Sequence, residues 1–402
     1  MKTNWQTKKL SDVCFFQEGP GIRKYEYKKN GYPIINVRCV KDGYIDLSNA
    51  QAVDPKFIKE KWTHFQVEEG DILFTTSGTI GRTAMATKDD LPLLMNTSVV
   101  RFKSLNEKEL DRYFLAWLLR SPKFIEEVKS YSSGTAQKNV GPTHLKLISI
   151  SYPPISEQKR IVKILDEAFE KIKTAKENTE KNLQNSKELF ESYLQNVFTN
   201  PGKDWEKKKL KEIGLTQTGT TPKTAEKKNY GNFIPFIKPA DVNFSGVGDI
   251  RYDNEGLSEI GFKKGRKMVR GSILMVCIGA TIGKVGFAEQ EVSCNQQINS
   301  LTVEKDFEPK FFYYAMVSNQ FQNKVLLEGK GAQATLPIIN KTKWENLEIQ
   351  YPVSKRDQIS IVKKLDSLSE QTKKLEEIYK QKLADLEELK KSILNKAFSG
   401  GL

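Results

Sequence analysis

Few residues of this 402-residue chain could perform chemistry, and those few do not form a catalytic pattern. The segment from Gly279 to Lys284 resembles a phosphate-binding loop, but only three residues separate its glycines instead of four, and Val285 stands where a Ser or Thr would bind magnesium. The segment Ser151-Tyr152-Pro153-Pro154 contains the letters of an adenine-methyltransferase tetrapeptide in the wrong order, and no glycine motif for a cofactor accompanies it. We therefore expect neither an ATP site nor a methyltransferase centre, and no catalytic residue.

Metal ligands and nucleophiles are also sparse. The chain has only two histidines, His64 and His144, and its four cysteines lack the CxxC spacing of zinc sites: Cys14, Cys39, Cys277 and Cys294. We expect no metal site and reduced, structural cysteines. Carboxylates such as Asp71 and Asp241 stay open as nuclease ligands, although no accompanying pattern supports them.

Two loops with small and basic residues are better suited to nucleic acid. The loops at Thr75–Gly78 and Ile278–Thr281 are predicted to lie between strands, where small residues allow a close backbone approach. The adjacent Arg82 or Lys284 could then meet a phosphate. The alternative is that the glycines are present because a structural turn requires them.

Other candidate contacts lie in basic, aromatic and amide-rich stretches. Arg and Lys can bond guanine in the major groove, and Asn and Gln can bond adenine. The candidate DNA-binding residues of the first half are Arg23, Lys24, Tyr25, Arg38, Thr76, Ser77, Gly78, Arg82, Asn96, Gln137 and Lys138. Those of the second half are Thr220, Thr221, Lys223, Lys228, Lys238, Ala280, Thr281, Lys284, Gln296, Gln297, Lys330 and Gln333.

The charge of the chain favours a polyanionic partner. Its net charge is +14, from 64 Lys and Arg against 50 Asp and Glu. The net charge is +6 in residues 1–155 and +5 in residues 199–353, but 0 in 156–198 and +3 in 354–402. No apolar stretch is long enough to span a bilayer and no signal peptide is recognisable, so we expect a cytoplasmic protein.

The sequence matches itself at a shift of about 200 residues. Trp5, Gln17 and Gly19 recur as Trp205, Gln217 and Gly219, and further matches run from the Gly-x-Ile-Leu segments at 70 and 271 to Gln158 and Gln358. By contrast, residues 20–68 and 220–268 share little. The two copies therefore share a common framework but differ in one region. Such a difference would suit a protein that recognises two different sequences.

Two segments without Gly or Pro are predicted to form long helices. Apolar or small residues in 4-3 spacing follow Ile161 and Leu165 in residues 156–198, and follow Ile361 and Leu365 in the repeat at 354–402. Ser156 and Ser354 are predicted N-caps. Each helix of roughly 43 residues would be about 65 Å long.

Antiparallel pairing is the simplest way for the two helices to bury both seams. It would bring Trp5 beside the end of the second helix and Trp205 beside the end of the first. Two exposed helices, or a coiled coil between two chains, are the alternatives.

The remaining stretches alternate Val, Ile, Phe and Tyr with turn residues, as strands do, while Leu110–Leu119 and Lys310–Val325 are predicted helices. The expected fold is α+β, with two mixed α/β domains (1–155 and 199–353) of twisted, antiparallel-rich sheet. A long antiparallel two-helix coiled coil (156–198 and 354–402) separates them in a pseudo-two-fold repeat.

The order of the sequence motifs, and their presence in both halves, resemble the specificity subunit of type I restriction-modification systems over the whole chain. The matching segments are 217–222 (QTGTTP), 230–237, the Gly-x-Ile-Leu segments, 134–137 (GTAQ), 331–333 (GAQ) and the helix opening at 152–158 (YPPISEQ). Two departures are visible. The first half has Gly19-Pro20-Gly21 in place of the Thr-Pro motif, and the second helix opens with Arg356-Asp357-Gln358.

The resemblance implies two target-recognition domains that read the halves of an asymmetric, interrupted site in double-stranded DNA, with helices that fix the gap. It further implies two methylation subunits bound to this chain, with restriction subunits in the full complex. S-adenosylmethionine, ATP and magnesium would belong to those partners and none to this chain, which would be non-catalytic. The alternatives are a recognition subunit whose partner fuses methylation and cleavage, and a stand-alone DNA-binding regulator.

Overall fold

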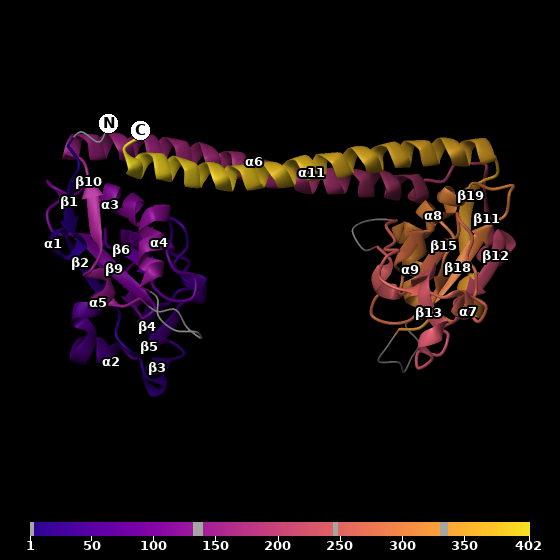
Figure 1. Cartoon of the computed structure of the whole chain (residues 1–402), viewed down its shortest axis with the longest axis horizontal. Coiled ribbons are helices and arrows are strands. Elements are labelled where there is room, and N and C mark those ends of the chain that lie inside the picture. The colour runs from indigo at the N-terminus through magenta and orange to yellow at the C-terminus, as the bar shows by residue number, and fades with distance from the viewer. Residues whose placement is uncertain (1–3, 132–139, 244–247, 330–336) are drawn as a thin grey trace. The chain divides into compact units, whose positions relative to one another are not determined.

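The computed structural model describes residues 4–131, 140–243, 248–329 and 337–402. The chain divides into two compact units. The first contains residues 1–180 and 380–402, and the second contains residues 181–379. Each unit therefore combines one globular region with parts of both long helices (Figure 1).

Three sheets form the globular part of the first unit. β1 (Gln6–Lys9) pairs antiparallel with β10 (Ser149–Tyr152). An antiparallel main sheet has the order β2 (Cys14–Glu18), β9 (Val99–Ser104), β6 (Ile72–Thr75), β7 (Thr83–Met85). A small sheet has the order β3 (Tyr27–Lys28), β5 (Gln51–Val53), β4 (Tyr32–Ile35), β8 (Leu94–Met95), with β4 and β8 parallel. The short helices are α1 (Leu10–Val13), α2 (Pro55–Phe57), α3 (Arg112–Leu119), α4 (Pro122–Ser130) and α5 (Pro142–Leu145).

The second unit repeats this plan, except that its small sheet has three strands in place of four. β11 (Trp205–Lys209) pairs with β19 (Glu348–Pro352), and the main sheet has the order β12 (Gly214–Thr218), β18 (Ile298–Val303), β15 (Ile273–Val276), β16 (Val285–Phe287). The small sheet has the order β14 (Gly256–Leu257), β13 (Tyr230–Ile237), β17 (Ser293–Cys294), with β13 and β17 parallel. The short helices are α7 (Glu259–Phe262), α8 (Pro309–Val317), α9 (Asn319–Gly329) and α10 (Lys341–Glu345). The duplication and the mixed α/β fold with antiparallel-rich sheets are confirmed.

Two short helices differ from the sequence prediction. The predicted helix Lys310–Val325 is interrupted at Ser318, whose extended backbone (ψ 146°) separates α8 from α9. The helix predicted to begin at Leu110 begins two residues later, at Arg112, because the Asp111 carboxylate accepts hydrogen bonds from the N–H groups of the first turn and so caps the helix.

The two long helices are confirmed as α6 (Ile155–Thr199) and α11 (Lys355–Ser399). Ser354 caps α11, since its Oγ accepts a hydrogen bond from Asp357 N at 3.4 Å. The prediction that Ser156 is the N-cap of α6 is wrong. Pro154 accepts the first helical hydrogen bonds, from Glu157 N at 2.9 Å and Gln158 N at 3.1 Å, so Ser156 already lies in the first turn.

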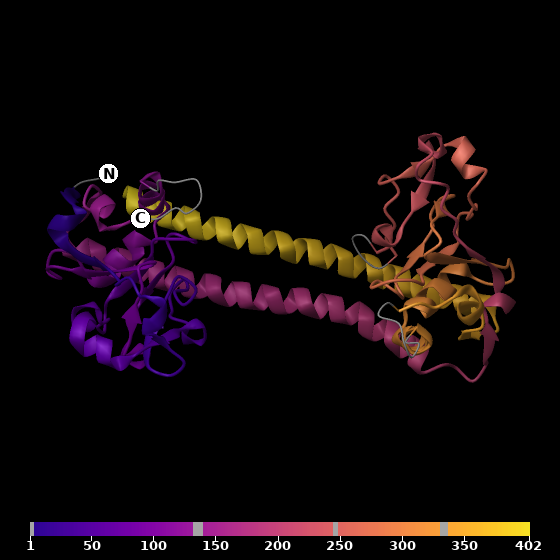
Figure 2. The ribbon, with the colours of Figure 1, turned by 90° about the horizontal axis from the view of Figure 1, so that it is seen from below.

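Within the first unit, the start of α6 and the end of α11 run antiparallel (Figure 2). Arg160 donates to the carbonyl of Leu402, and Lys176 pairs with Glu387 at 3.1 Å, so the residue number falls along one helix as it rises along the other. The seam residues Ile161 and Leu165 of α6 enter one core with α3 and with Leu394 and Phe398 of α11. The tertiary core therefore includes the helices as well as the sheets.

The second unit buries the other ends of the helices in the same way. Phe190, Leu194 and Phe198 of α6 share a core with Val362 and Leu365 of α11 and with α8. The antiparallel pairing predicted from the seams is thus seen inside each unit.

The predicted positions of the two tryptophans are confirmed. Trp5 contacts Phe114 with ring centroids 6.4 Å apart, and Phe114 contacts Phe398 near the end of α11 at 5.4 Å. Trp205 contacts Phe198 near the end of α6 at 6.1 Å. Edge-to-face aromatic contacts thus anchor each globular region to a helix end.

The repeated glutamines Gln158 and Gln358 join each helix to its globular region. Both side chains are fully buried. The Gln158 amide donates to the carbonyls of Glu109 and Pro153 and accepts from Asp111 N, each at 2.8 to 2.9 Å. Gln358 makes the matching contacts with the carbonyl of Pro352 and the N–H of Glu308. These backbone partners explain why glutamine recurs at the start of both helices.

Candidate nucleic-acid interface

Loops from the main and small sheets of the first unit meet in a surface that we call the first loop face: residues 19–23, 36–38, 76–82 and 96–98. The parallel strands β4 and β8 end side by side, and Asn96 N donates to Ile35 O at 3.0 Å. Ser98 binds the neighbouring loops, because its Oγ accepts from Val37 N and its carbonyl accepts from Thr76 N, both at 3.0 Å. Three of the four chain segments are thereby fixed against one another, by two backbone hydrogen bonds and by the Ser98 hydroxyl.

The second unit builds an equivalent second loop face from residues 219–223, 238–241, 277–284 and 295–297. Asn295 N donates to Ile237 O at 3.0 Å, and Cys277 N donates to Gln297 O at 2.8 Å. These bonds match those of Asn96 and Thr76 in the first unit. The duplication therefore extends to the hydrogen-bond frame of the loops.

Gly19 and Gly219 are required by the close packing of this frame. A Cβ at Gly19 would lie 2.2 Å from Met95 O, and one at Gly219 would lie 2.1 Å from Asn295 O. No side chain fits at such distances, so both positions need glycine. The repeat of Gly19 as Gly219 therefore reflects a steric requirement of the loop face.

The glycines of the β6–β7 and β15–β16 loops are explained by the turns in which they lie. Gly81 has a φ of 103° and donates its N–H to Thr75 O at 3.0 Å, while Gly283 has a φ of 92° and donates to Val276 O at 2.9 Å. Positive φ favours glycine. Gly78 and Gly279, the glycines of the two predicted loops, also have positive φ, of 62° and 107°, which favours the turn interpretation. A contact with phosphate remains a prediction.

The side chains on the two frames differ. Thr97 and Ser98 occupy the tip that Gln296 and Gln297 occupy in the second unit, and Asn36 stands where the second unit has Lys238. Thr97 and Gln296 are both exposed at this tip. The two faces thus offer different hydrogen-bonding groups from the same backbone positions.

One cation is common to both faces. Arg82 and Lys284 lie at matching positions, because Thr75 N donates to Arg82 O at 3.0 Å and Val276 N donates to Lys284 O at 2.9 Å. Both side chains are half-buried, and within the described residues neither has an ion pair or a side-chain hydrogen bond. Such a cation is available to an anionic ligand.

The other predicted residues of the first loop face differ in how far they are available. Arg38 and Gly78 are exposed and Ser77 is half-buried, whereas Thr76 has only 2% of its surface exposed and takes part through its backbone. The Asn96 side chain is occupied locally, since its Oδ1 accepts from the N–H and hydroxyl of Ser98. Asn96 therefore shapes the loop rather than projecting from it.

In the second loop face, the structure joins several predicted residues in pairs. Thr221 donates to Gln296, and Gln297 accepts from Asn295 Nδ2 at 3.0 Å. Lys238 pairs with Glu255. Thr220 and Thr281 are half-buried and Ala280 is exposed.

Most of the remaining predicted residues lie outside the loop faces or outside the described residues. Arg23, Lys24, Tyr25, Lys223 and Lys228 are exposed, and all but Arg23 and Lys223 lie beyond the loop faces, toward the small sheets. The predicted residues Gln137, Lys138, Lys330 and Gln333 lie outside the residues that the structure describes.

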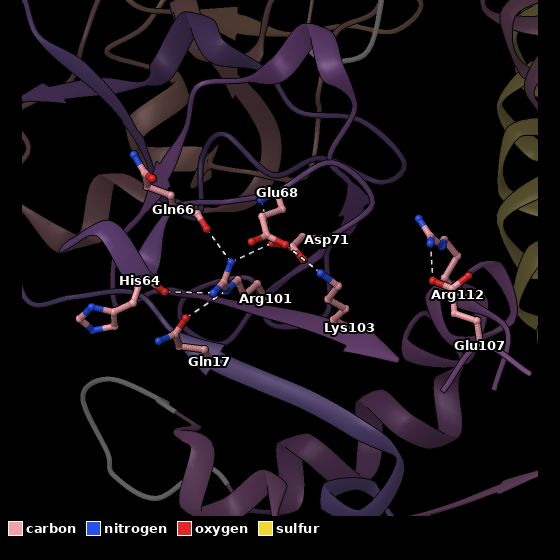
Figure 3. A network of polar contacts seen from close by, with 9 residues as sticks. All are labelled: Gln17, His64, Gln66, Glu68, Asp71, Arg101, Lys103, Glu107 and Arg112. Atoms are coloured by element: carbon pink, nitrogen blue, oxygen red, sulfur yellow. Dashed lines mark hydrogen bonds and ion pairs between the residues drawn. The ribbon is translucent and has the colours of Figure 1, made fainter. Parts of the chain in front are cut away.

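Arg101, which the sequence did not single out, organises the interior next to the first loop face (Figure 3). Its guanidinium bonds Gln17 Oε1 and Asp71 Oδ2 at 3.0 Å and also binds the carbonyls of His64 and Gln66. It thereby ties β2 and β9 to the chain that precedes β6. The only sign of the ion pair between Arg101 and Asp71 in the sequence is a charged residue at an inward position of the apolar strand β9.

In the second unit, two serines replace this ion pair. The register of β12, β18 and β15 places Ser300 at the position of Arg101, and Ser272 precedes β15 as Asp71 precedes β6. Ser272 bonds Thr302 at 2.8 Å, and Ser300 contacts Met268. The two units therefore fill the same interior position with different chemistry.

The carboxylates considered as nuclease ligands have structural roles. Asp71 is buried against Arg101, and Asp241, which is 2% exposed, accepts from Lys238 N at 2.9 Å and Asn254 Nδ2 at 3.0 Å. Among the described residues, no three His, Cys, Asp or Glu side chains are grouped so that they could hold a metal ion. Burial also raises the pKa of the Cys14 thiol to about 12, which keeps this cysteine protonated at neutral pH.

Comparison with known proteins identifies the family. The family model of the type I restriction modification DNA specificity domain matches residues 2–184 and again residues 202–387. The chain belongs to this family. The two matches coincide with the two copies of the internal repeat, and the role of the chain is DNA sequence recognition in a restriction-modification system.

Named relatives and solved structures of specificity subunits are similar over the whole length. A putative type I restriction enzyme specificity subunit, MjaX of Methanocaldococcus jannaschii, is 24% identical, and the match covers 99% of this chain and 93% of the relative. The EcoBI specificity subunit of Escherichia coli is 21% identical over 99% of this chain and 86% of its own length. The HsdS subunit of Thermoanaerobacter tengcongensis has the same fold, with a TM-score of 0.65 at 20% identity over 100% of this chain and 98% of its own.

A chain solved in a study of complex assembly of a type I restriction-modification system is also similar, with a TM-score of 0.75 at 20% identity over 100% of this chain and 99% of that one. These structures support the fold. In the described part of the specificity-domain chain, no helix has the length and apolar character needed to cross a membrane.

Proposed function

We propose that each loop face of this specificity-domain chain reads one half of an interrupted, asymmetric DNA site. The observation that carries the proposal is the pair of matching backbone hydrogen bonds that fixes each loop face, on which different side chains stand. A fixed backbone holds the reading groups in register, and exchange of the groups changes the bases that they bond.

The charges at the loop faces fit this role. Arg82 and Lys284 supply one cation at the same place on each face, which would position a phosphate without selecting a base. The exposed tips, Thr97 in one unit and Gln296 in the other, would supply discrimination, which is worth about 1 to 3 kcal/mol for a good bidentate contact. Positioning and selection are thus assigned to different residues.

The proposed partners follow from the family. We propose that two methylation subunits bind this chain and that restriction subunits join the full complex. The chain itself would be non-catalytic and bind no cofactor, while S-adenosylmethionine, ATP and magnesium act on the partner subunits. The length of α6 and α11 would set the gap between half-sites, so that an inserted helical turn changes the gap or prevents assembly.

Exchange of the two tip residues tests the proposal. In cells that carry the complete system, Thr97→Gln should change the methylated sequence in one half-site only, and Gln296→Thr should change it in the other half only. Thr342→Gln, at an exposed position of α10 outside both loop faces, is the matched control and should leave both half-sites unchanged. Mapping of methylated positions in genomic DNA gives the result. A change in both half-sites from one substitution would contradict the assignment of one reader to each half.

A further inference from the structure

The positive charge of each unit is concentrated in a small part of it. We define the basic lobe of the first unit as residues 21–33 and 51–66, and that of the second as residues 223–233 and 251–270. The first lobe contains 7 Lys and Arg and 3 acidic residues, and the second contains 9 and 4. The net charge of the second lobe, +5, equals that of the whole region 199–353, so the remainder of that region is neutral.

Each basic lobe packs, together with the rest of its small sheet, around a separate buried core. In the first unit Ile34, Val53, Ile58, Trp62 and Leu94 form a separate buried cluster, and in the second unit a cluster forms around Phe236 and Leu257. Because this core holds the apolar side chains inside, the lysines remain on the outside. Every Lys and Arg of the first lobe is exposed.

Acidic neighbours neutralise only some of these cations. In the first lobe Lys61 pairs with Glu26 at 2.6 Å and Lys28 with Asp54 at 3.4 Å. Three exposed lysines of the first lobe and three of the second have no ion pair within the described residues: Lys24, Lys29, Lys59, Lys223, Lys227 and Lys228. A surface with unpaired like charges is suited to an extended polyanion.

The first lobe also contains an open groove of about 410 Å³ beside the turn between β3 and β4. Tyr27, Lys28, Lys29 and Gln51 are among its lining residues. Lys29, which is unpaired among the described residues, Lys28, which is paired with Asp54 at 3.4 Å, a phenol and an amide are groups that bond phosphate oxygens. The groove is therefore suited to a phosphodiester strand.

The basic lobes are continuous with the loop faces. The parallel strands β4 and β8 belong to the small sheet of the first unit and end at Ile35 and Met95, directly before loop-face residues. β13 and β17 do the same in the second unit, where they end at Ile237 and Cys294. A duplex bound at a loop face could thus extend onto the lobe of the same unit.

We propose that the basic lobe of each unit binds the phosphate backbone of double-stranded DNA next to the half-site read by its loop face. The inference rests on the proposed function and adds a division of labour to it. Most cations of the lobes are lysines, which act as point charges on phosphate and do not select bases. The lobes would therefore supply affinity that is independent of sequence.

Removal of unpaired lysines from one lobe tests the inference. The full chain, in complex with its methylation subunits, is prepared with Lys24→Gln, Lys29→Gln and Lys59→Gln together. The control carries Lys108→Gln, Lys123→Gln and Lys146→Gln, three exposed lysines of the first unit outside the lobe. Affinity for a duplex with the methylated site, and for a scrambled duplex, is measured as a function of salt concentration.

The lobe variant should lose affinity for both duplexes alike. Each lost phosphate contact should lower the slope of log K against log salt by about 0.9, which corresponds to about fivefold weaker binding at 0.15 M salt. The methylated sequence should not change. An unchanged slope, or an equal loss in the control, would overturn the inference. Failure of the proposed function would appear separately, as a parental complex that does not prefer the site over the scrambled duplex.

Discussion

Replacement of Arg101 by serine removes the guanidinium that holds four acceptors together in the first unit. Asp71 is 1% exposed, so without Arg101 its carboxylate would be buried without a counter-ion. The carbonyls of His64 and Gln66 and the Gln17 amide would each lose a donor as well. Breaking a buried ion pair from one side costs about 3 to 5 kcal/mol, and we expect Arg101→Ser to lower the free energy of unfolding of this unit by that amount.

The second unit suggests the compensating change, because serine stands at both positions there. Adding Asp71→Ser to Arg101→Ser removes the uncompensated charge, and we expect this to restore about 2 kcal/mol of the loss. The double variant should stay less stable than the parent, since the carbonyls of His64 and Gln66 still lack their donor. The two substitutions should therefore be strongly non-additive.

Hydrogen exchange measured by mass spectrometry can follow each unit separately, which matters because a chain with two units need not unfold in one step. Amides of β6 and β9 report on the first unit, and those of β15 and β18 serve as the internal reference. Arg101→Ser should reduce protection in β6 and β9 and leave that of β15 and β18 unchanged. If the double variant is no more stable than Arg101→Ser alone, Asp71 is not the source of the cost and the reasoning is refuted.

Two further predictions follow from the loop frame and from a buried carboxyl. Gly19→Ala and Gly219→Ala should each impair recognition of one half-site while the other half is still read, whereas Gly141→Ala, which lies outside both loop faces and whose added Cβ would meet only Glu18 Oε2 at 3.8 Å, should have no effect; methylation mapping checks all three. Hydrogen bonds from Lys8 and then from Tyr152 lower the pKa of the Glu109 carboxyl in the folded chain. These bonds therefore stabilise the fold fully above the pKa that Glu109 has in the unfolded chain. The stabilisation is lost as the pH falls through the lower pKa of the folded chain. Unfolding midpoints of Glu109→Gln measured from pH 7 downward should fall less steeply in acid than those of the parent, and equal slopes would count against this assignment.

Features that depend on local pattern were predictable from the sequence. The duplication, the seams of α6 and α11 and the antiparallel pairing follow from identities at a fixed shift and from 4-3 spacing. Deviations from the prediction were local as well. Pro154, not Ser156, receives the first helical hydrogen bonds, and Ser318 separates two helices where one was predicted.

The candidate site was predictable only in outline. Small residues and cations in the β6–β7 and β15–β16 loops indicated a surface for nucleic acid, but the sequence could not show that Thr76 is buried or that Asn96 bonds Ser98. Burial and hydrogen-bond partners depend on segments that are distant in sequence. The roles of individual loop residues therefore required the tertiary structure.

By itself, the sequence determined that the chain is a duplicated α+β protein with two long helices and a basic surface. Repeats and helix seams follow from the spacing of residues along the chain, and net charge follows from its composition. The tertiary structure decided which loops meet and which charges are occupied. Arg101 and Asp71 are 30 residues apart and become partners only when β6 pairs with β9, while the unpaired lysines gather only when the small sheet folds. Such contacts arise from chain topology, and no local pattern encodes them.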